Sequence, residues 1–204
     1  MVVIIDYDLG NPKSIKNMLK KINVHSIISS SKNDILNSNR LILPGVGSFD
    51  YGIKKLKEFD LIDVLEKKVI VEKTPFLGIC LGMQLLFDKS EEGQSKGLGW
   101  VKGECLKFSE NVFKYPVPNM GWLETNILKS TKFTQDLNTL SRYYYLHSYY
   151  VKCLDKSNIM MQTSYNQIYT SAVIKDNIIG VQFHPEKSHK FGMKLFKNFI
   201  SINE

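Results

Sequence analysis

The sequence predicts an α/β fold in one domain, residues 1–204, with a central and mostly parallel sheet flanked by helices and an added antiparallel sheet region. Three observations favour this class. In the first half of the chain, short apolar runs typical of strands alternate with segments whose apolar residues recur at helical spacing. From Gly99 onward, short runs rich in β-branched and aromatic residues follow one another instead. The chain then ends in a further helical pattern.

The elements of the first half follow from these patterns. Strands are predicted at residues 2–6, 24–29, 40–43 and 76–79. Helices are predicted over residues 14–21 and 59–71. Strand and helix in alternation predict a parallel sheet, and active sites lie at the carboxyl ends of such strands.

The second half is predicted to be rich in short strands. They cover residues 106–108, 121–127, 143–149, 158–163 and 169–175. Residues 178–183 are expected to return to the central sheet. The last helix places Phe191, Leu195 and Phe199 on one face.

Composition indicates a soluble enzyme domain. A chain of 204 residues, 43% of them apolar, can close a sizeable core without disulfides. Three widely spaced cysteines argue against a disulfide framework and favour a reducing cytoplasm. The apolar start is too short for a signal peptide, and no apolar stretch reaches membrane-spanning length. We therefore expect a cytoplasmic protein without a metal.

The formal charge of +7 does not predict nucleic-acid binding, because the lysines are scattered and no recognition motif accompanies them. We interpret them as a solvated surface. An alternative is a basic rim that steers an anionic, phosphorylated substrate toward the protein, which predicts a salt-dependent reaction rate.

Cys80 stands between Gly78 and Gly82, where an apolar strand passes into a helix. In the pattern G-x-C-x-G the glycines allow close backbone approach around a sharp turn that exposes the nucleophile. The start of a helix at Leu81 would add N–H groups that favour a thiolate. The sequence therefore predicts a cysteine nucleophile, whereas Cys105 and Cys153 are expected to be inert core residues.

His184 and Glu186 are the candidate base and its orienting carboxylate. They follow the apolar segment at residues 178–183. A thiol nucleophile needs an imidazole to take and return its proton, and a carboxylate to fix the imidazole tautomer. In an extended segment, residues two apart project to the same face, so both side chains are expected to face one point. His147 is a rival base, ranked lower because no carboxylate lies two residues away.

The turn at residues 44–47 follows another strand and contains Gly45 and Gly47. One peptide N–H from Val46 or Gly47, with that of Leu81, would supply two donors to the oxyanion of an acyl-transfer intermediate. We expect the turn to reorient a peptide to complete this site, since glycine makes such a change sterically cheap.

Five motifs together resemble the class I glutamine amidotransferases, and the resemblance extends over essentially the whole chain. In sequence order they read LPGVGSF, GICLGMQLLF, VPNMGW, YYYLHSYY and GVQFHPEKS. The likeness is greatest to the glutaminase subunits of imidazole glycerol phosphate synthase, a histidine-pathway enzyme. The resemblance implies that glutamine is hydrolysed through a γ-glutamyl thioester on Cys80, with His184 as acid and base and Glu186 as its orienter.

The resemblance also implies further site residues and a partner. Gln84, Glu92 and the backbone around Ser148 and Tyr149 would hold L-glutamine. Ammonia would pass through a tunnel to a barrel-fold cyclase or synthase subunit in a heterodimer, with no cofactor or metal and with no nucleic acid or membrane involved.

Several positions depart from the family pattern, and they gather where the partner is expected to dock. The residues expected there are Asn11, Asn119, Met120 and Trp122. Asn119 replaces an imidazole of the motif, Leu123 replaces an amide, and Asp8 and Pro12 also differ. A paralogue that feeds ammonia to another synthase, such as a sugar amidotransferase, therefore stays open. So does a stand-alone cysteine hydrolase; a non-catalytic relative is disfavoured because all three triad residues are present.

Overall fold

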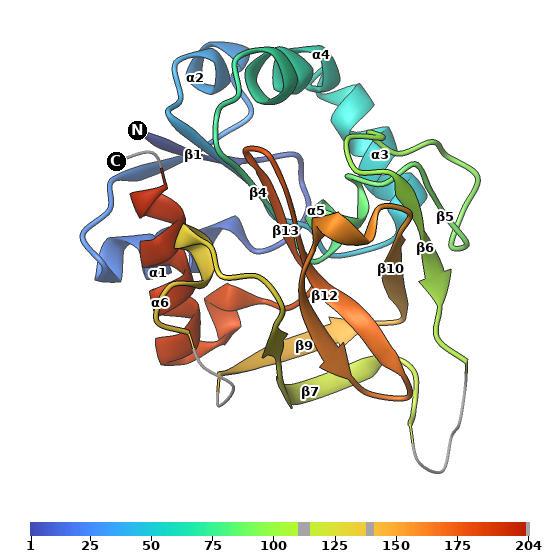
Figure 1. The fold of residues 1–204 in the computed structure, drawn as a ribbon. Helices are drawn as coiled ribbons and strands as arrows, with labels where there is room; N and C mark the ends of the chain where they lie inside the picture. Colours follow the sequence, from blue (N-terminus) through green and yellow to red (C-terminus); the bar gives the residue numbers. More distant parts are fainter. Residues whose placement is uncertain (110–114, 138–140, 203–204) are drawn as a thin grey trace.

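The computed structural model describes residues 1–109, 115–137 and 141–202. Within them, a main sheet of 11 strands crosses the molecule (Figure 1), and a second sheet pairs two strands. Five neighbouring strands of the main sheet are parallel. In spatial order they are β2 (Ser26–Ser29), β1 (Val2–Ile5), β3 (Arg40–Leu43), β4 (Phe76–Ile79) and β13 (Ile178–Val181).

The sheet continues beyond β13 with mostly antiparallel pairings, apart from the short parallel pair β5 and β6. These strands are β12 (Ile168–Lys175), β10 (Tyr149–Cys153), β6 (Gly103–Lys107) and β5 (Lys89–Ser90). A branch adds β11 (Ile159–Ser164), which pairs with β12, and β8 (Asn126–Ile127), which pairs with β11. The small sheet pairs β7 (Asn119–Glu124) with β9 (Arg142–His147). The predicted α/β class with an antiparallel region is confirmed.

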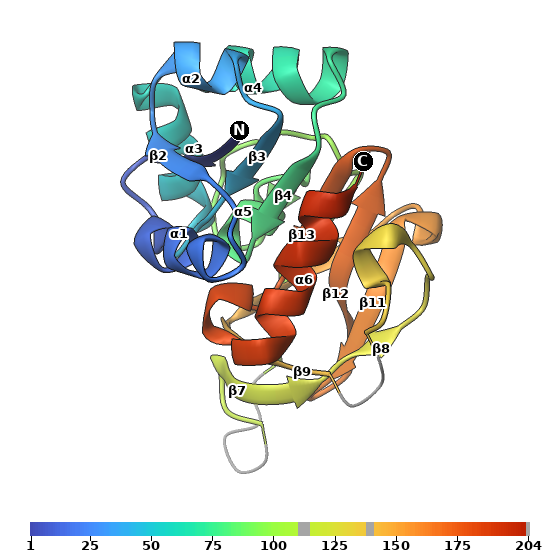
Figure 2. The ribbon, with the colours of Figure 1, turned by 90° about the vertical axis from the view of Figure 1, so that its left-hand side faces the viewer.

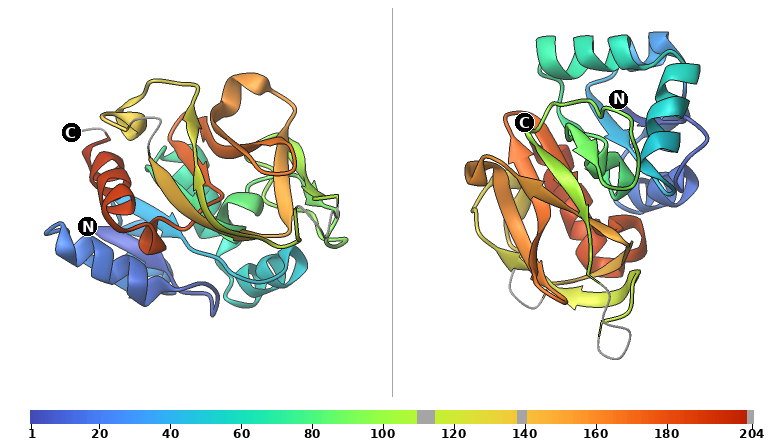
Figure 3. Two further views of the ribbon diagram at one scale, coloured as in Figure 1. Left: turned by 90° about the horizontal axis from the view of Figure 1, so that it is seen from below. Right: turned by 90° about the vertical axis from the view of Figure 1, so that its right-hand side faces the viewer.

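Helices cover both faces of the parallel strands (Figures 2 and 3). One face packs against α1 (Pro12–Lys21) and α6 (His189–Ser201). The other packs against α2 (Lys32–Leu36), α3 (Phe49–Glu58), α4 (Ile62–Glu66) and the π-helix η1 (Lys67–Val71). Short single turns complete the chain: α5 (Leu81–Gln84) and the 3-10 turns η2 (Lys132–Thr134), η3 (Lys156–Asn158) and η4 (Pro185–Lys187).

Burial on both faces explains the unbroken apolar runs of these strands. In β1, Val2 and Ile4 enter the core under α1 and α6, whereas Val3 and Ile5 enter the opposite core. Successive side chains of a strand point to opposite faces, so a strand covered on both sides must be apolar throughout. Because β3, β4 and β13 are parallel neighbours, their carboxyl ends lie together at one edge of the sheet.

The structure differs from the predicted elements at several places. The helix expected over residues 59–71 is broken, because Phe59 ends α3 and Asp60 takes a positive φ of 52° before α4 and η1. Both α2 and α3 were missed. The strand expected over residues 143–149 divides, since the chain bends at Ser148 and passes from the small sheet to the main sheet.

No helix in the three described stretches is both long and apolar enough to cross a membrane.

Candidate active site

Cys80 occupies a sharp turn between β4 and α5. Its φ of 54° and ψ of −110° lie outside the conformations that L-residues prefer. A Cβ at Gly78 would overlap the Gly82 carbonyl, and one at Gly82 would overlap the Leu43 carbonyl of β3. Both flanking glycines are therefore required for backbone segments to approach this closely, and the turn holds the cysteine at the end of the sheet.

Strand pairing brings His184 to the same place. Ile79 of β4 is in register with Val181 of β13, and the Cys80 amide donates to the Val181 carbonyl at 2.8 Å. His184 follows three residues later, and its own amide donates to the Tyr144 carbonyl at 2.8 Å. The cysteine and the histidine, 104 positions apart in sequence, thus follow two adjacent parallel strands.

His184 and Glu186 form a buried pair. Nδ1 of the imidazole lies 2.8 Å from Oε1 of the carboxylate. Burial by itself lowers the pKa of His184, but the neighbouring Cys80 sulfur and Glu186 carboxylate outweigh it and raise that pKa. Nε2 has no hydrogen-bond partner among the described residues, which leaves it available to a reacting group.

The geometric reason given from sequence for this pairing is wrong. β13 ends at Val181, and Glu186 lies in the 3-10 turn η4 rather than in an extended segment. The two side chains meet because Pro185 starts a tight turn directly after the histidine. The Ser188 hydroxyl fixes that turn by donating to the His184 carbonyl at 2.7 Å.

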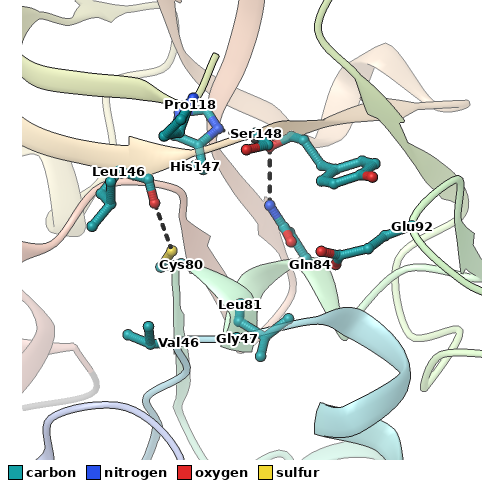
Figure 4. Close-up of a pocket in the computed structure, with 11 residues that line it drawn as sticks. Val46, Gly47, Cys80, Leu81, Gln84, Glu92, Pro118, Leu146, His147 and Ser148 are labelled. Carbon is teal, nitrogen blue, oxygen red and sulfur yellow. Dashed lines mark hydrogen bonds between the residues drawn. The ribbon is translucent and has the colours of Figure 1, made fainter.

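A pocket of about 200 Å³ opens at Cys80 (Figure 4). Its volume lies below the range of drug-sized sites and suits a small metabolite. Cys80 contributes the sulfur, which lies 3.9 Å from the Leu146 carbonyl. The lining residues are Val46, Gly47, Cys80, Leu81, Gln84, Glu92, Pro118, Leu146, His147, Ser148 and Tyr149.

Every residue predicted to hold glutamine or the oxyanion lines this pocket. Gln84 uses both N–H groups internally, donating to the Tyr149 carbonyl and to Gln182 Oε1, each at 3.0 Å. Glu92 accepts from the Phe49 amide at 2.7 Å at the start of α3, and burial raises the pKa of its carboxyl. Gln84 and Glu92 therefore also have structural contacts of their own.

His147 also lines the pocket, but hydrogen bonds engage both of its ring nitrogens. Nδ1 lies 2.7 Å from the Tyr149 carbonyl, and Nε2 lies 3.1 Å from the Asn119 side-chain amide. Burial lowers the pKa of His147 to about 4. A neutral imidazole with both nitrogens occupied does not suit a general base, whereas His184 has a free nitrogen.

The turn at residues 44–47, which follows β3, packs against the sharp turn at Cys80 between β4 and α5, which we call the elbow. The Tyr7 hydroxyl donates to the Pro44 carbonyl at 2.6 Å, and a Cβ at Gly45 would lie 2.7 Å from the Gly82 amide nitrogen. Gly47 has a φ of 125°. The helix expected after Cys80 begins at Leu81 but is a single turn, so a helix macrodipole contributes less to this site than predicted.

The predicted partner-docking residues separate into exposed and buried ones. Along β7 the side chains alternate, with Met120 62% and Trp122 41% exposed. Asn119 has no exposed surface, so the prediction that it faces a partner is wrong; it contacts His147 and Tyr169 instead. Asn11 is exposed and caps α1 by accepting from the Ser14 amide at 3.2 Å.

The other two cysteines are buried, and burial raises the pKa of both thiols, that of Cys153 to about 12. In the described parts of the chain, no group of three or more His, Cys, Asp or Glu residues is arranged to hold a metal ion.

Sequence reasoning assigned no site role to Gln182, Tyr7, Pro118 and Leu146. Gln182 contacts the Cys80 sulfur, Tyr7 contacts the turn at residues 44–47, and the other two line the pocket. Gln182, Pro118 and Leu146 had a signal, because they lie within three of the five motifs quoted for the family resemblance, whereas Tyr7 lies in none of them. Pro118, Leu146 and Tyr7 are brought in by the small sheet and by β1, whose positions depend on tertiary packing.

Comparison with known proteins gives a family and a fold. A family model described as "Glutamine amidotransferase class-I" matches residues 3–202. A relative from Methanococcus maripaludis, "Imidazole glycerol phosphate synthase subunit HisH 2", is 56% identical over 201 residues, which are 98% of each chain. A Pseudomonas aeruginosa protein of the same name is 44% identical over 202 residues, 99% of this chain and 100% of the relative.

A solved structure, "Crystal structure of glutamine amidotransferase", superposes with a TM-score of 0.77 at 16% sequence identity. The match covers 99% of this chain and 98% of that chain. At this identity it establishes the likeness of fold alone.

Proposed function

The chain belongs to the class I glutamine amidotransferase family, and on that premise we propose that it is the glutaminase subunit of imidazole glycerol phosphate synthase, in histidine biosynthesis. It hydrolyses L-glutamine to glutamate and ammonia. The observation that most supports this chemistry is a cysteine that lines a small pocket at the end of β4, with the buried His184–Glu186 pair following the adjacent parallel strand β13.

In the proposed mechanism, the Cys80 sulfur attacks the side-chain carbonyl carbon of glutamine. The tetrahedral oxyanion would receive N–H donors from Leu81 and from Val46 or Gly47, which line the pocket. His184, charged and oriented by Glu186, gives its proton to the leaving nitrogen, and the carbon–nitrogen bond breaks to release ammonia.

A γ-glutamyl thioester then remains on Cys80. Water attacks it while His184, now neutral, accepts the water proton, and the carbon–sulfur bond breaks to give glutamate and free enzyme. Gln84, Glu92 and the backbone at Ser148 and Tyr149 are proposed to hold the substrate, since all four line the pocket.

We further propose that the chain acts as one domain in the cytoplasm and transfers ammonia to a barrel-fold cyclase subunit in a heterodimer. Met120 and Trp122 are the proposed contacts, because both are exposed on the same face of β7. The burial of Asn119 removes it from that contact surface.

The test uses the complex of this chain with its cyclase subunit. Cys80→Ala should abolish glutamine-dependent product formation, whereas added ammonium should still drive the cyclase, because free ammonia bypasses the thiol. Cys153→Ala, a buried cysteine outside the pocket, is the matched control and should keep the glutamine-dependent rate. Glutamine-dependent turnover by the Cys80→Ala complex would refute the proposal.

A second candidate is a paralogue that supplies a different synthase, such as a sugar amidotransferase. Asn119 favours it, because this position carries an imidazole in the family motif and here forms a buried contact with His147. Expression in a histidine auxotroph that lacks its own glutaminase subunit separates the two. Growth supports the histidine pathway; no growth, with ammonia transfer to a different captured synthase, supports the paralogue.

A third candidate, a stand-alone cysteine hydrolase, is distinguished from a glutaminase subunit by the rate at which the isolated chain hydrolyses its substrate. A glutaminase that depends on its partner is slow alone and is stimulated when the partner is added. Rapid peptide cleavage without a partner would favour the hydrolase.

A further inference from the structure

We propose that Gln182 is a positioning residue for the nucleophile: its side-chain amide donates an N–H to the Cys80 sulfur, and Gln84 holds it in that orientation. The inference deepens the proposed function, on which it rests for the role of Cys80 as nucleophile.

The contact lies beneath the pocket. Gln182 follows β13, has no exposed surface and does not line the pocket. Its Nε2 lies 3.7 Å from the sulfur of Cys80. An N–H donor directed at sulfur stabilises the thiolate more than the thiol, because it favours the charged form. Gln182 therefore acts on the nucleophile through its contact with the sulfur.

The orientation of the Gln182 amide follows from a group that can only accept. The backbone carbonyl of Tyr149 lies 3.0 Å from the Gln84 amide, so the atom facing it must be Nε2, the donor. The other N–H of the same nitrogen faces Gln182 at 3.0 Å, so that atom of Gln182 must be Oε1, an acceptor. The remaining end, Nε2, then faces the sulfur.

A flipped Gln182 amide would fail at its contact with Gln84. Its nitrogen would face the Gln84 nitrogen, donor against donor, and its oxygen would face the sulfur, where a thiol could donate a proton but a thiolate could not. Both glutamine side chains are buried, and a buried polar group without a hydrogen-bond partner destabilises the folded protein. The network thus admits only the arrangement in which Gln182 donates to Cys80.

The same carbonyl fixes a second branch of the network. Tyr149 accepts from His147 Nδ1 at 2.7 Å, so Nε2 of this neutral ring accepts from the Asn119 amide at 3.1 Å. Asn119 donates its other proton to the Tyr169 hydroxyl at 3.0 Å. His147 accordingly shares an acceptor with Gln84 and supports the polarity of the first branch.

The other titratable groups that act on Cys80 are His184 from the η4 side and Tyr7 from β1. Neither residue is substituted in a Gln182 variant. The variant therefore removes the amide donor while both titratable neighbours of Cys80 remain in the chain.

The test measures alkylation of Cys80 by iodoacetamide in the isolated full-length chain, without glutamine or partner. The rate is followed from pH 5 to pH 10, and mass spectrometry of the Cys80 peptide separates it from the other two cysteines. Gln182→Met keeps the side-chain length and removes the donor. Asn198→Leu is the matched control, because Asn198 is a buried amide of α6 that donates to the Phe133 and Gln135 carbonyls, away from the pocket.

In Gln182→Met, the pH of half-maximal alkylation should rise by about one unit and the rate at pH 7 should fall about tenfold, since a thiolate loses its donor. Asn198→Leu should keep the wild-type profile. An unchanged profile in Gln182→Met would overturn the inference.

Gln182→Glu decides the matter if the methionine variant does not fold. It keeps the shape and the acceptor for Gln84 but replaces the donor by a second acid, so two acids would share one negative charge beside Gln84. The half-maximal pH should then rise by more than in Gln182→Met. A wild-type profile in this variant would equally refute the role.

The readout separates this inference from the proposed function. If wild-type Cys80 resists alkylation throughout, the nucleophile assignment fails and the inference fails with it. If wild type is alkylated and the Gln182 variants match it, only the role of Gln182 fails. In the complex, the variants should lower kcat for glutamine, because Gln182 contacts the sulfur that attacks the substrate.

Discussion

At His147, two hydrogen bonds and burial determine the chemistry of the side chain. Its Nδ1 proton is held by the Tyr149 carbonyl, and its Nε2 accepts from Asn119. Burial disfavours the charged ring, which is why the pKa of His147 falls to about 4. A second histidine near a nucleophile is thus a structural part of the pocket wall, and the imidazole with a free nitrogen is that of His184.

This difference predicts a pH-dependent stability contribution from His147. Between about pH 6.5 and pH 4 the unfolded ring binds a proton and the folded ring does not, so protons favour the unfolded state and stability falls as pH falls. His147→Gln removes this contribution. The wild-type free energy of unfolding, measured by urea denaturation, should therefore decline more steeply than that of His147→Gln through this window.

Measurements above about pH 7.5 supply the control, since the ring is neutral there in both states and the difference between the two proteins should not vary with pH. Parallel curves for the two proteins down to pH 4 would contradict the assignment of a buried neutral ring.

Among the elements, the elbow depends on how closely β3, β4 and α5 approach. Gly82 allows this approach, because any Cβ at this position would overlap the Leu43 carbonyl of β3. The sequence showed the glycines but not their neighbours. β3 supplies the carbonyl, and the turn that follows β3 supplies the candidate oxyanion donors, so packing at Gly82 also determines the distance between that turn and Cys80.

We expect Gly82→Ala to destabilise the protein by about 2 kcal/mol, since overpacking a close backbone contact costs about 1–3 kcal/mol. It should also slow Cys80 alkylation by displacing the turn. Gly52→Ala is the matched control. Gly52 lies in α3, where a Cβ would meet only the flexible ends of the Leu85 and Leu81 side chains, at 3.1 and 3.3 Å. Alanine also favours the helix.

Chemical denaturation measures both variants. A Gly82→Ala protein as stable as Gly52→Ala would show that β3 yields easily and that the close approach is not required.

At the scale of the whole molecule, aromatic contacts of Trp122 connect the exposed face of β7 to the segment that carries the His184–Glu186 pair. Trp122 stacks on His189 with ring centroids 5.5 Å apart and an interplanar angle of 4°. His189 begins α6, directly after the turn that carries Glu186. A partner bound at Met120 and Trp122 would therefore contact the segment that carries His184 and Glu186.

Trp122→Ala should lower partner-stimulated glutamine turnover at least tenfold, because buried tryptophans dominate many interfaces. Alkylation of Cys80 in the isolated chain should stay near wild type. Val71→Ala is the control: Val71 is 74% exposed at the end of η1, which follows α4, and α4 and β7 lie at opposite ends of the molecule (Figures 1 and 2). Equal stimulation in both variants would place the docking surface elsewhere.

Sequence patterns predicted the elements that are locally encoded. The strands β3 and β4 lie at the predicted residues, and the ends of β1 and α1 lie within two residues of their predicted ends. α3 was not predicted although Phe49, Ile53 and Leu56 recur at helical spacing, because this segment was interpreted only through the Gly-rich turn that precedes it. The break near Asp60 was also missed, since a positive φ at a non-glycine residue leaves no periodic signal.

The sequence alone determined the fold class, the family and the residue types of the candidate site, since apolar periodicity and short motifs act over a few neighbouring residues. Only the tertiary structure decided which polar atoms meet. Asn119 is buried, both ring nitrogens of His147 are hydrogen-bonded, and the side-chain amide of Gln182 contacts the Cys80 sulfur. Such contacts join segments of different strands, whose positions depend on packing across the whole molecule.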